Sequence, residues 1–350
     1  MKTASYAAQT AESLLAPMTI ERREPHANDV SIDILYCGVC HSDLHTARND
    51  WGWTVYPAVP GHEIVGRVSA VGSEVAKYNI GDLVAVGCMV DSCQHCKPCH
   101  AGEEQYCGHR VDTYNTPDGS AMGHTMGGYS NHVVVREEFV LSVPENLDTA
   151  RVAPLVCAGI TTYSPLRTWN VGPGSQVAVI GLGGLGHMAV KLAAAMGAHV
   201  TAITRSASKA DEAKALGADA VLISTDTAAM KHAADRFELI IDTVPVKHDI
   251  NPYMPLLELD GTLVIVGQVG LMQELHTAPM ILGRRRVAGS LIGGVAETQE
   301  MLDFCGKTGV LPEVEMIRMD QINEAYERLE KSDVRYRFVI DMSSMPAFEG

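Results

Sequence analysis

Residues 176–197 read QVAVIGLGGLGHMAVKLAAAMG. Residues 176–180 form a largely apolar, β-branched run, which predicts a buried strand. Six glycine and leucine residues follow, and apolar side chains then recur at helical spacing as far as Met196. Gly197 predicts the end of that helix. A strand, a glycine-rich turn and a helix in this order predict the first unit of a dinucleotide-binding fold.

The turn has the pattern G-x-G-x-x-G. It comprises Gly181, Leu182, Gly183, Gly184, Leu185 and Gly186. The first glycine of the pattern permits a tight turn, the second lets the backbone approach a pyrophosphate, and the third lets helix and strand pack closely. The helix that follows presents N–H groups to the phosphates. A glycine-rich turn without a ligand is the alternative, and the flanking strand and helix favour the nucleotide.

Apolar runs and helical patterns keep alternating after this turn. Strands are expected at residues 176–180, 199–204, 220–223, 239–242, 263–266 and 287–291. Six strands joined by crossovers suffice for a doubly wound parallel sheet, so an α/β fold is predicted. Beyond residue 294 the pattern predicts helix, strand, helix and strand at residues 298–304, 314–319, 320–331 and 336–341.

The first 150 residues are instead rich in turns and short β-branched runs. Strands are expected at residues 30–36, 64–71, 82–86 and 129–135. Because Gly, Pro, Asn and Asp separate these runs, the pattern predicts an irregular β-barrel or sandwich. Residues 43–62 and 90–128 are expected to be long coil, which in a compact domain is usually functional or cross-linked.

Length and composition limit the possible functions. A chain of 350 residues predicts two domains, and 46% hydrophobic with 20% charged residues is typical of a globular protein. The 27 basic and 42 acidic residues give a net charge of −15, which disfavours a nucleic-acid partner. The sequence has neither a long apolar run nor a signal-peptide pattern. No membrane span is therefore expected, and the expected location is cytoplasmic.

Four of the nine cysteines share one short segment, Cys93-x2-Cys96-x2-Cys99-x7-Cys107. Four thiolates on one loop can close around a tetrahedral Zn²⁺, and a site without an open position is structural. A redox-active pair or buried thiols are the alternatives. Small core positions are expected for Cys37, Cys88 and Cys305.

The end of the second predicted strand indicates which dinucleotide binds. It reads Thr204-Arg205-Ser206-Ala207-Ser208-Lys209. A site for NAD usually places Asp or Glu there to bind the ribose 2′-hydroxyl. Here no carboxylate repels a 2′-phosphate, and hydroxyl, guanidinium and ammonium groups are available to bind one, so NADP(H) is favoured. The alternative is that Arg205 and Lys209 are ordinary solvated charges.

Other residues of metal-binding types are scattered along the chain. Cys40 begins the segment CHSDLH, His62 and Glu63 follow Gly61, and Cys157 precedes the nucleotide-binding half. Cysteine and histidine are the common ligands of zinc. No spacing rule joins these positions, however, and a single Cys or His is more often a packed residue than a ligand.

The segment from Gly61 to Val75 resembles the signature of the zinc-containing alcohol dehydrogenases in the medium-chain dehydrogenase/reductase superfamily. The four-cysteine segment, the Cys157 segment and the G-x-G-x-x-G follow in that family's order. Residues 36–45, 181–186 and 289–293 resemble the cinnamyl alcohol dehydrogenase branch. Within that branch, residues 157–166 and 297–305 resemble the bacterial NADPH-dependent broad-range aldehyde reductases. The resemblance spans nearly the whole chain. It implies a GroES-like β-barrel catalytic domain, residues 1–156 and 294–350, and a Rossmann domain with a doubly wound parallel sheet, residues 157–293.

The resemblance also implies two zinc ions per subunit and roles for individual residues. The expected ligands of the catalytic zinc are Cys40, His62 and Cys157, with Glu63 close enough to join in some states. The proton relay and the carboxylate that binds the zinc-bound histidine correspond to Ser42, His45 and Asp43. Further cofactor contacts correspond to Ser42, Thr243, Gly267, Ser290, Leu291 and Ile292. The walls of the substrate pocket correspond to Trp51, Trp53, Tyr56 and Leu291, unless the tryptophans merely pack a loop.

Together these expectations describe an NADP(H)-dependent zinc alcohol dehydrogenase or aldehyde reductase. The zinc would polarise an aldehyde, the nicotinamide would supply hydride, and the relay would supply a proton; the reverse reaction oxidises a primary alcohol. Aromatic and aliphatic aldehydes are the expected substrates, and a homodimer is the expected assembly. An NAD-linked polyol or secondary-alcohol dehydrogenase is one alternative, and a nucleotide-binding protein without enzymatic activity is the other.

Overall fold

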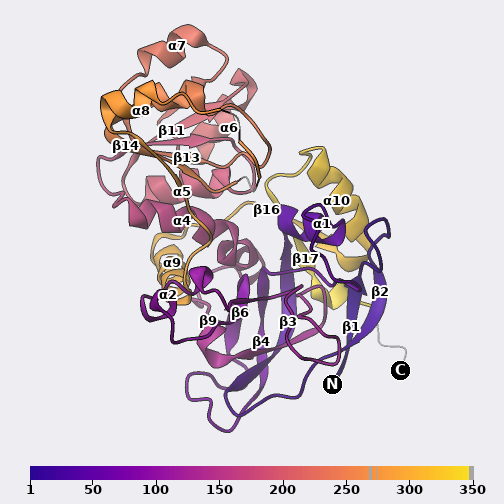
Figure 1. Cartoon of the computed structure of the whole chain (residues 1–350). Coiled ribbons are helices and arrows are strands. Elements are labelled where there is room, and N and C mark those ends of the chain that lie inside the picture. Colours follow the sequence, from indigo (N-terminus) through magenta and orange to yellow (C-terminus); the bar gives the residue numbers. More distant parts are fainter. Residues whose placement is uncertain (268–269, 273, 347–350) are drawn as a thin grey trace. The chain divides into compact units, whose positions relative to one another are not determined.

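The computed structural model of the chain describes residues 1–267, 270–272 and 274–346. The chain divides into two compact units (Figure 1). The terminal unit comprises Met1–Cys157 together with Gly293–Gly350, so both ends of the sequence belong to it. The central unit comprises Ala158–Ile292. Each unit is built on a sheet of its own.

The central unit contains a parallel sheet. Its strands are β10 (Gln176–Ile180), β11 (His199–Thr204), β12 (Ala220–Ile223), β13 (Phe237–Asp242), β14 (Leu257–Ile265) and β15 (Arg286–Gly289). Their order is β12-β11-β10-β13-β14-β15, and each neighbouring pair is parallel. The order reverses between β10 and β13, where a doubly wound sheet opens a crevice at the carboxyl ends of its strands. The predicted α/β sheet is confirmed, although β13 and β14 begin earlier than expected.

One helix precedes these strands, and further helices and 3₁₀ turns connect them. They are α4 (Ala158–Thr168), α5 (Gly186–Ala195), α6 (Ala210–Ala215), α7 (Thr227–His232) and α8 (Ala278–Gly283), with the 3₁₀ turns η4 (Ala207–Lys209) and η5 (Asn251–Leu256). The helix predicted after the glycine-rich turn is α5, and Gly197 follows it with a φ of 89°. The sequence did not predict α4, because residues 158–166 are all buried and give no amphipathic pattern, and because Pro165 is read as a helix breaker.

A buried apolar cluster supports the strands of the central unit. Ile180, Phe237, Ile240 and Leu263 belong to it, on β10, β13 and β14. Burial of a side chain such as Phe237 contributes about 1.5–3 kcal/mol. Such a rigid scaffold fixes the ends of the strands and therefore the loops that follow them.

The terminal unit contains a mostly antiparallel sheet. Its strands are β3 (Asp29–Val39), β4 (Ile64–Val71), β5 (Leu83–Val86), β8 (His132–Arg136), β9 (Leu141–Ser142), β16 (Val314–Arg318) and β17 (Arg337–Asp341). Their order is β16-β17-β3-β4-β5-β9, and β8 also pairs with β3. Phe338 of β17 lies opposite Val39 of β3. Figure 1 shows the consequence, with the yellow C-terminal strand beside the indigo β3.

Shorter elements complete the terminal unit. Two further strand pairs are β1 (Lys2–Ala7) with β2 (Ala16–Glu21), and β6 (Met89–Asp91) with β7 (Val111–Asp112). The helices are α1 (His41–Ala47), α2 (Lys97–His100), α3 (Thr149–Val152), α9 (Val295–Thr308) and α10 (Ile322–Glu330). The 3₁₀ turns are η1 (Glu104–Tyr106), η2 (Glu137–Phe139), η3 (Ala153–Val156), η6 (Met319–Gln321) and η7 (Met342–Ser344). Across the described ranges of both units, no helix is long and apolar enough to cross a membrane.

The expectation of coil over residues 43–62 is wrong at its beginning, where α1 lies. The carboxylate of Asp43 accepts a hydrogen bond of 2.8 Å from the backbone N–H of Cys40, which stabilises the first turn of α1. Seven helical residues are too few for hydrophobic periodicity to reveal. Residues 90–128 are mostly coil as expected, interrupted by short elements such as α2 and β7.

The chain enters α9 at Gly294, where it approaches the segment after α2. A Cβ atom at this position would overlap the carbonyl oxygen of Gly102 and lie 2.8 Å from Oε2 of Glu104. Because a backbone oxygen cannot move aside cheaply, we expect Gly294→Ala to lower the free energy of unfolding by about 1–3 kcal/mol. Gly172→Ala, at a position with open space around it, should change it by less than about 0.5 kcal/mol. Urea unfolding of both variants tests this, and equal midpoints would contradict it.

Candidate functional site

The carboxylate of Asp43 ties together segments that are distant in sequence. Asp43 lies on α1 and is fully buried. It accepts hydrogen bonds from the backbone N–H groups of Cys40 at 2.8 Å and Gly61 at 3.0 Å, and from the Tyr129 hydroxyl at 3.3 Å. Hydrogen bonds to an ionised acceptor are stronger than neutral ones. They hold the end of β3 next to the segment that leads into β4.

Four side chains of metal-binding types meet at this point. The ligand atoms of Cys40, His62, Glu63 and Cys157 all lie within 4.8 Å of one another, and the four residues are buried. The Sγ atoms of Cys40 and Cys157 are 3.9 Å apart, and Nε2 of His62 lies 3.2 Å from Sγ of Cys157. The structure thus brings together residues that no spacing rule could join. Two sulfurs and an imidazole nitrogen are a donor set that suits Zn²⁺.

The thiols of Cys40, Cys88 and Cys157 shift one another's pKa. A hydrogen bond from Cys157 holds the pKa of Cys40 well below its usual range, and the positive charge of Arg337 acts in the same direction. The hydrogen bond between Cys157 and Cys88 lowers the pKa of Cys88 to about 6. Cys88 is only half-buried, with its Sγ 3.9 Å from the Val156 carbonyl oxygen. Its expected role as a simple core residue is therefore wrong.

Glu63, a member of this cluster, forms an ion pair with Arg337 of β17. Nη2 of Arg337 lies 3.4 Å from Oε1 of Glu63, and both residues are buried. Burial raises the pKa of Glu63 to about 8, although Arg337 opposes the shift. Neither carboxylate oxygen of Glu63 has a hydrogen-bond partner in the described part of the chain. Sequence reasoning missed Arg337, because only the pairing of β17 with β3 brings it here.

The other ring nitrogen of His62 has two oxygen neighbours. Nδ1 lies 3.0 Å from the Tyr114 hydroxyl and 3.2 Å from Oδ1 of Asp43. The predicted Asp43 is thus in contact with His62, and the unpredicted Tyr114 lies closer. Burial raises the pKa of Tyr114 well above its usual range, so the phenol stays neutral. Nothing in the sequence around Tyr114 marked it as a neighbour of this site.

A second titratable pair lies at the other end of α1. Nδ1 of His45 is 2.7 Å from Oδ2 of Asp50, a residue that sequence reasoning missed five positions downstream. The His45 ring centroid is 5.3 Å from that of Trp51, which stacks on Trp53 at 5.5 Å. Ser42 lies on α1, two positions after Cys40. Tyr56 donates a hydrogen bond to a carbonyl of the same helix, that of Ala47.

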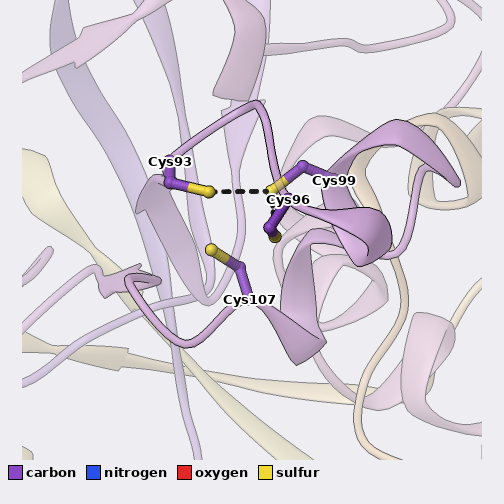
Figure 2. Close-up of side chains that lie close together, drawn as sticks. All are labelled: Cys93, Cys96, Cys99 and Cys107. Atoms are coloured by element: carbon purple, nitrogen blue, oxygen red, sulfur yellow. Dashed lines mark hydrogen bonds between the residues drawn. The ribbon is translucent and has the colours of Figure 1, made fainter.

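The four-cysteine segment forms a compact cluster of its own. Figure 2 shows the side chains of Cys93, Cys96, Cys99 and Cys107 with their sulfurs turned toward one another. All four sulfurs lie within 4.8 Å of one another. Sγ of Cys99 is 3.4 Å from that of Cys96 and 3.9 Å from that of Cys93. Four sulfurs at this separation suit a closed tetrahedral zinc site.

The glycine-rich turn of the central unit has the geometry its pattern requires. Gly181, directly after β10, has a φ of 89°. A Cβ atom at Gly186 would overlap the carbonyl oxygen of Gly181, so helix and strand approach closely there. No atom lies within 4 Å of a Cβ placed on Gly183, which leaves its backbone open to a ligand. The hydroxyl of Thr243 donates to the Ile180 carbonyl at 2.8 Å and stabilises the turn.

The residues expected around the dinucleotide follow neighbouring strands of the same sheet. After β11, Nζ of Lys209 lies 3.5 Å from the Leu182 carbonyl oxygen, which joins this segment to the glycine-rich turn. Ser206 caps η4 by accepting a hydrogen bond from the Ser208 N–H. After β14, a Cβ atom on Gly267 would meet the Thr243 backbone. The expected contacts at residues 290–292 follow β15, and Ser290 N–H donates to the Ile265 carbonyl at 3.2 Å.

Comparison with known proteins gives a consistent picture. The family model of the alcohol dehydrogenase GroES-like domain matches residues 26–145, and that of the zinc-binding dehydrogenases matches residues 184–307. The chain is 55% identical to aldehyde reductase YahK of Escherichia coli, covering 97% of this chain and 98% of that protein. It is 53% identical to an NADP-dependent alcohol dehydrogenase C of Mycolicibacterium smegmatis, covering 99% of each.

Solved structures agree with these sequence relatives. A cinnamyl alcohol dehydrogenase from Sorghum bicolor superimposes with a TM-score of 0.95 and 47% identity, covering 100% of both chains. The cinnamyl alcohol dehydrogenase from Helicobacter pylori, solved as a complex with NADP(H), superimposes with a TM-score of 0.89 and 41% identity, covering 99% of both chains.

The four-cysteine cluster gives a prediction about stability. Replacing Cys99 by serine removes a sulfur that lies 3.9 Å from that of Cys93 and 3.4 Å from that of Cys96. We expect one equivalent of zinc per chain to be lost and the free energy of unfolding to fall by more than about 3 kcal/mol. Cys305→Ala, which removes a buried thiol on α9, should keep the full zinc content. Elemental analysis and urea unfolding measure both effects, and a Cys99 variant with unchanged zinc content would show the cluster to be no zinc site.

Proposed function

Because this chain belongs to the zinc-binding alcohol dehydrogenase family, we propose that it interconverts aldehydes and primary alcohols with NADP(H) as the hydride carrier. The observation that carries the proposal is the convergence of Cys40, His62 and Cys157 in one buried cluster. The names of the relatives, an aldehyde reductase and NADP-dependent alcohol dehydrogenases, support it.

We assign the catalytic zinc to Cys40, His62 and Cys157, and the structural zinc to the four-cysteine cluster. Three protein ligands leave one position open for a substrate oxygen. Two thiolates and a neutral imidazole balance the charge of a divalent cation. When bound, zinc supplies a Lewis acid that polarises the carbonyl, and NADPH supplies the hydride.

Ser42, His45 and Asp50 form the proton path in this proposal. Ser42 lies two positions after a zinc ligand, and its hydroxyl gives a proton to the oxygen that becomes the alcohol. His45 returns the proton from solvent, since a third of its side chain is exposed. Asp50 binds Nδ1 of His45 at 2.7 Å and leaves Nε2 as the nitrogen that exchanges protons.

The segment after β11 selects NADP(H) over NAD(H). Thr204 and Ser206 supply hydroxyl groups, and Arg205 and Lys209 supply positive charge, where NAD-binding proteins usually carry a carboxylate. The 3.5 Å contact of Lys209 with the Leu182 carbonyl keeps this segment beside the glycine-rich turn. The NADP(H) complex of the related Helicobacter pylori enzyme supports the same choice.

The substrate class follows from aromatic side chains near the relay. Trp51 stacks between His45 and Trp53, and Tyr56 lies in the same loop. These three side chains offer an apolar surface for aromatic and aliphatic aldehydes. Trp53 is 60% exposed, so its indole is free to meet a ligand.

We also propose a homodimer in the cytoplasm. Strand β15 is the edge of the parallel sheet, and on neighbouring α8 Ile281 and Leu282 are 75% and 84% exposed. Edge strands with apolar neighbours pair readily with a second copy. A reducing compartment keeps the six cysteines of the two proposed zinc sites reduced, as zinc binding through their thiolates requires.

A coupled assay tests the proposed activity. We expect NADPH absorbance to fall when benzaldehyde is added, and chelator treatment to abolish the reaction. Cys40→Ala should lose turnover yet bind NADPH normally, as measured by fluorescence titration, because Cys40 and the glycine-rich turn belong to different units. Cys305→Ala is the matched control and should remain active. Turnover that survives both the chelator and the Cys40 substitution would refute the proposal, as would oxidation of polyols with NAD⁺ alone.

Thr204→Asp tests the choice of cofactor. A carboxylate at the end of β11 would repel the 2′-phosphate and accept a hydrogen bond from the ribose of NAD(H). We expect the ratio of kcat/KM for NADPH to that for NADH to fall by at least about tenfold, or about 1.4 kcal/mol. Thr204→Ser keeps the hydroxyl and should keep the ratio. A ratio that stays constant in both variants would place the 2′-phosphate elsewhere.

A further inference from the structure

Tyr114 contacts the candidate metal ligand His62 although no sequence pattern pointed to it. It lies in the coil that follows β7. We propose that Tyr114 is a positioning residue that fixes the ring of His62 through its hydroxyl and its own ring, and so holds the catalytic metal in place. This inference rests on the proposed catalytic zinc site.

Two independent contacts place Tyr114 on His62. The phenol oxygen lies 3.0 Å from Nδ1, which is hydrogen-bonding distance. The two ring centroids are 5.4 Å apart with an interplanar angle of 41°. The hydroxyl therefore restrains the direction of Nδ1, and the ring contact restrains the tilt of the imidazole plane.

Asp43, the other neighbour of Nδ1, divides its hydrogen bonds among several donors. A carboxylate has about four acceptor positions. Asp43 uses three of them for the N–H groups of Cys40 and Gly61 and for the Tyr129 hydroxyl, which leaves one for His62. Its Oδ1 is also farther from Nδ1 than the Tyr114 oxygen is, at 3.2 Å. Asp43 therefore mainly holds the backbone of the ligand segments, and Tyr114 shares the single Nδ1–H.

The direction of the hydrogen bond between His62 and Tyr114 follows from the contact that the other ring nitrogen of His62 makes. Nε2 of His62 is turned to the Cys157 sulfur at 3.2 Å, so a metal bound there uses Nε2. Nδ1 then carries the proton and donates it, and Tyr114 accepts.

Tyr114→Phe keeps the ring and removes the hydroxyl. Loss of such an outer partner typically costs 10–100-fold in metal affinity. We expect chelator-driven release of the catalytic zinc to become at least about tenfold faster, and the visible spectrum of the cobalt(II)-substituted protein to change. The release phase of the catalytic zinc is identified by comparison with Cys40→Ala, which should show only the structural phase.

Tyr78→Phe is the matched control. Tyr78 is likewise a buried tyrosine, its hydroxyl donates a hydrogen bond to the Val140 carbonyl, and it lies outside the metal cluster. It should leave the release rate and the cobalt spectrum as in the wild type.

The outcomes separate this inference from the proposed function. If wild-type protein shows a catalytic phase and Tyr114→Phe releases that zinc at the wild-type rate with an unchanged cobalt spectrum, Tyr114 has no positioning role. If Tyr114→Phe and Tyr78→Phe accelerate release equally, the effect is general destabilisation and the inference also fails. If the wild type shows no catalytic phase at all, the proposed zinc site itself is wrong.

Discussion

A buried carboxylate, that of Asp43, determines whether the metal ligands can meet. An ionised group in the interior is costly unless hydrogen bonds replace its hydration. Asp43 obtains them from the backbone of Cys40 and Gly61, the residues that bear or directly precede two ligands. The same bonds that stabilise the charge therefore fix the ligand positions, and α1 begins where the carboxylate caps it.

Charge balance explains why the site suits a divalent cation. Cys40 and Cys157 place two sulfurs 3.9 Å apart in a buried space, where two thiolates would repel each other strongly. A cation between them offsets that repulsion, and neutral His62 adds a ligand without adding charge. Glu63 lies 3.4 Å from Arg337, so a negative charge on Glu63, when it is ionised, is paired.

Local patterns in the sequence predicted what depends on local structure. Two motifs each occupy one continuous stretch of chain, namely the strand, turn and helix around Gly181 and the cysteine cluster around Cys99. The spacing of their residues alone therefore identified them. The other metal site joins residues 40, 62 and 157, and only the family resemblance pointed to it. Arg337 and Tyr114 were missed because tertiary contacts alone bring them to Glu63 and His62.

The convergence of two sulfurs and one imidazole on a single open metal site is the central claim, and a crystal structure with anomalous scattering measured at the zinc edge tests it most directly. The account predicts a zinc peak bonded to Cys40 and Cys157 at about 2.3 Å and to His62 Nε2 at about 2.0 Å. A second peak should lie within the four-cysteine cluster. A fully zinc-loaded crystal with no peak between Cys40, His62 and Cys157 would contradict the account.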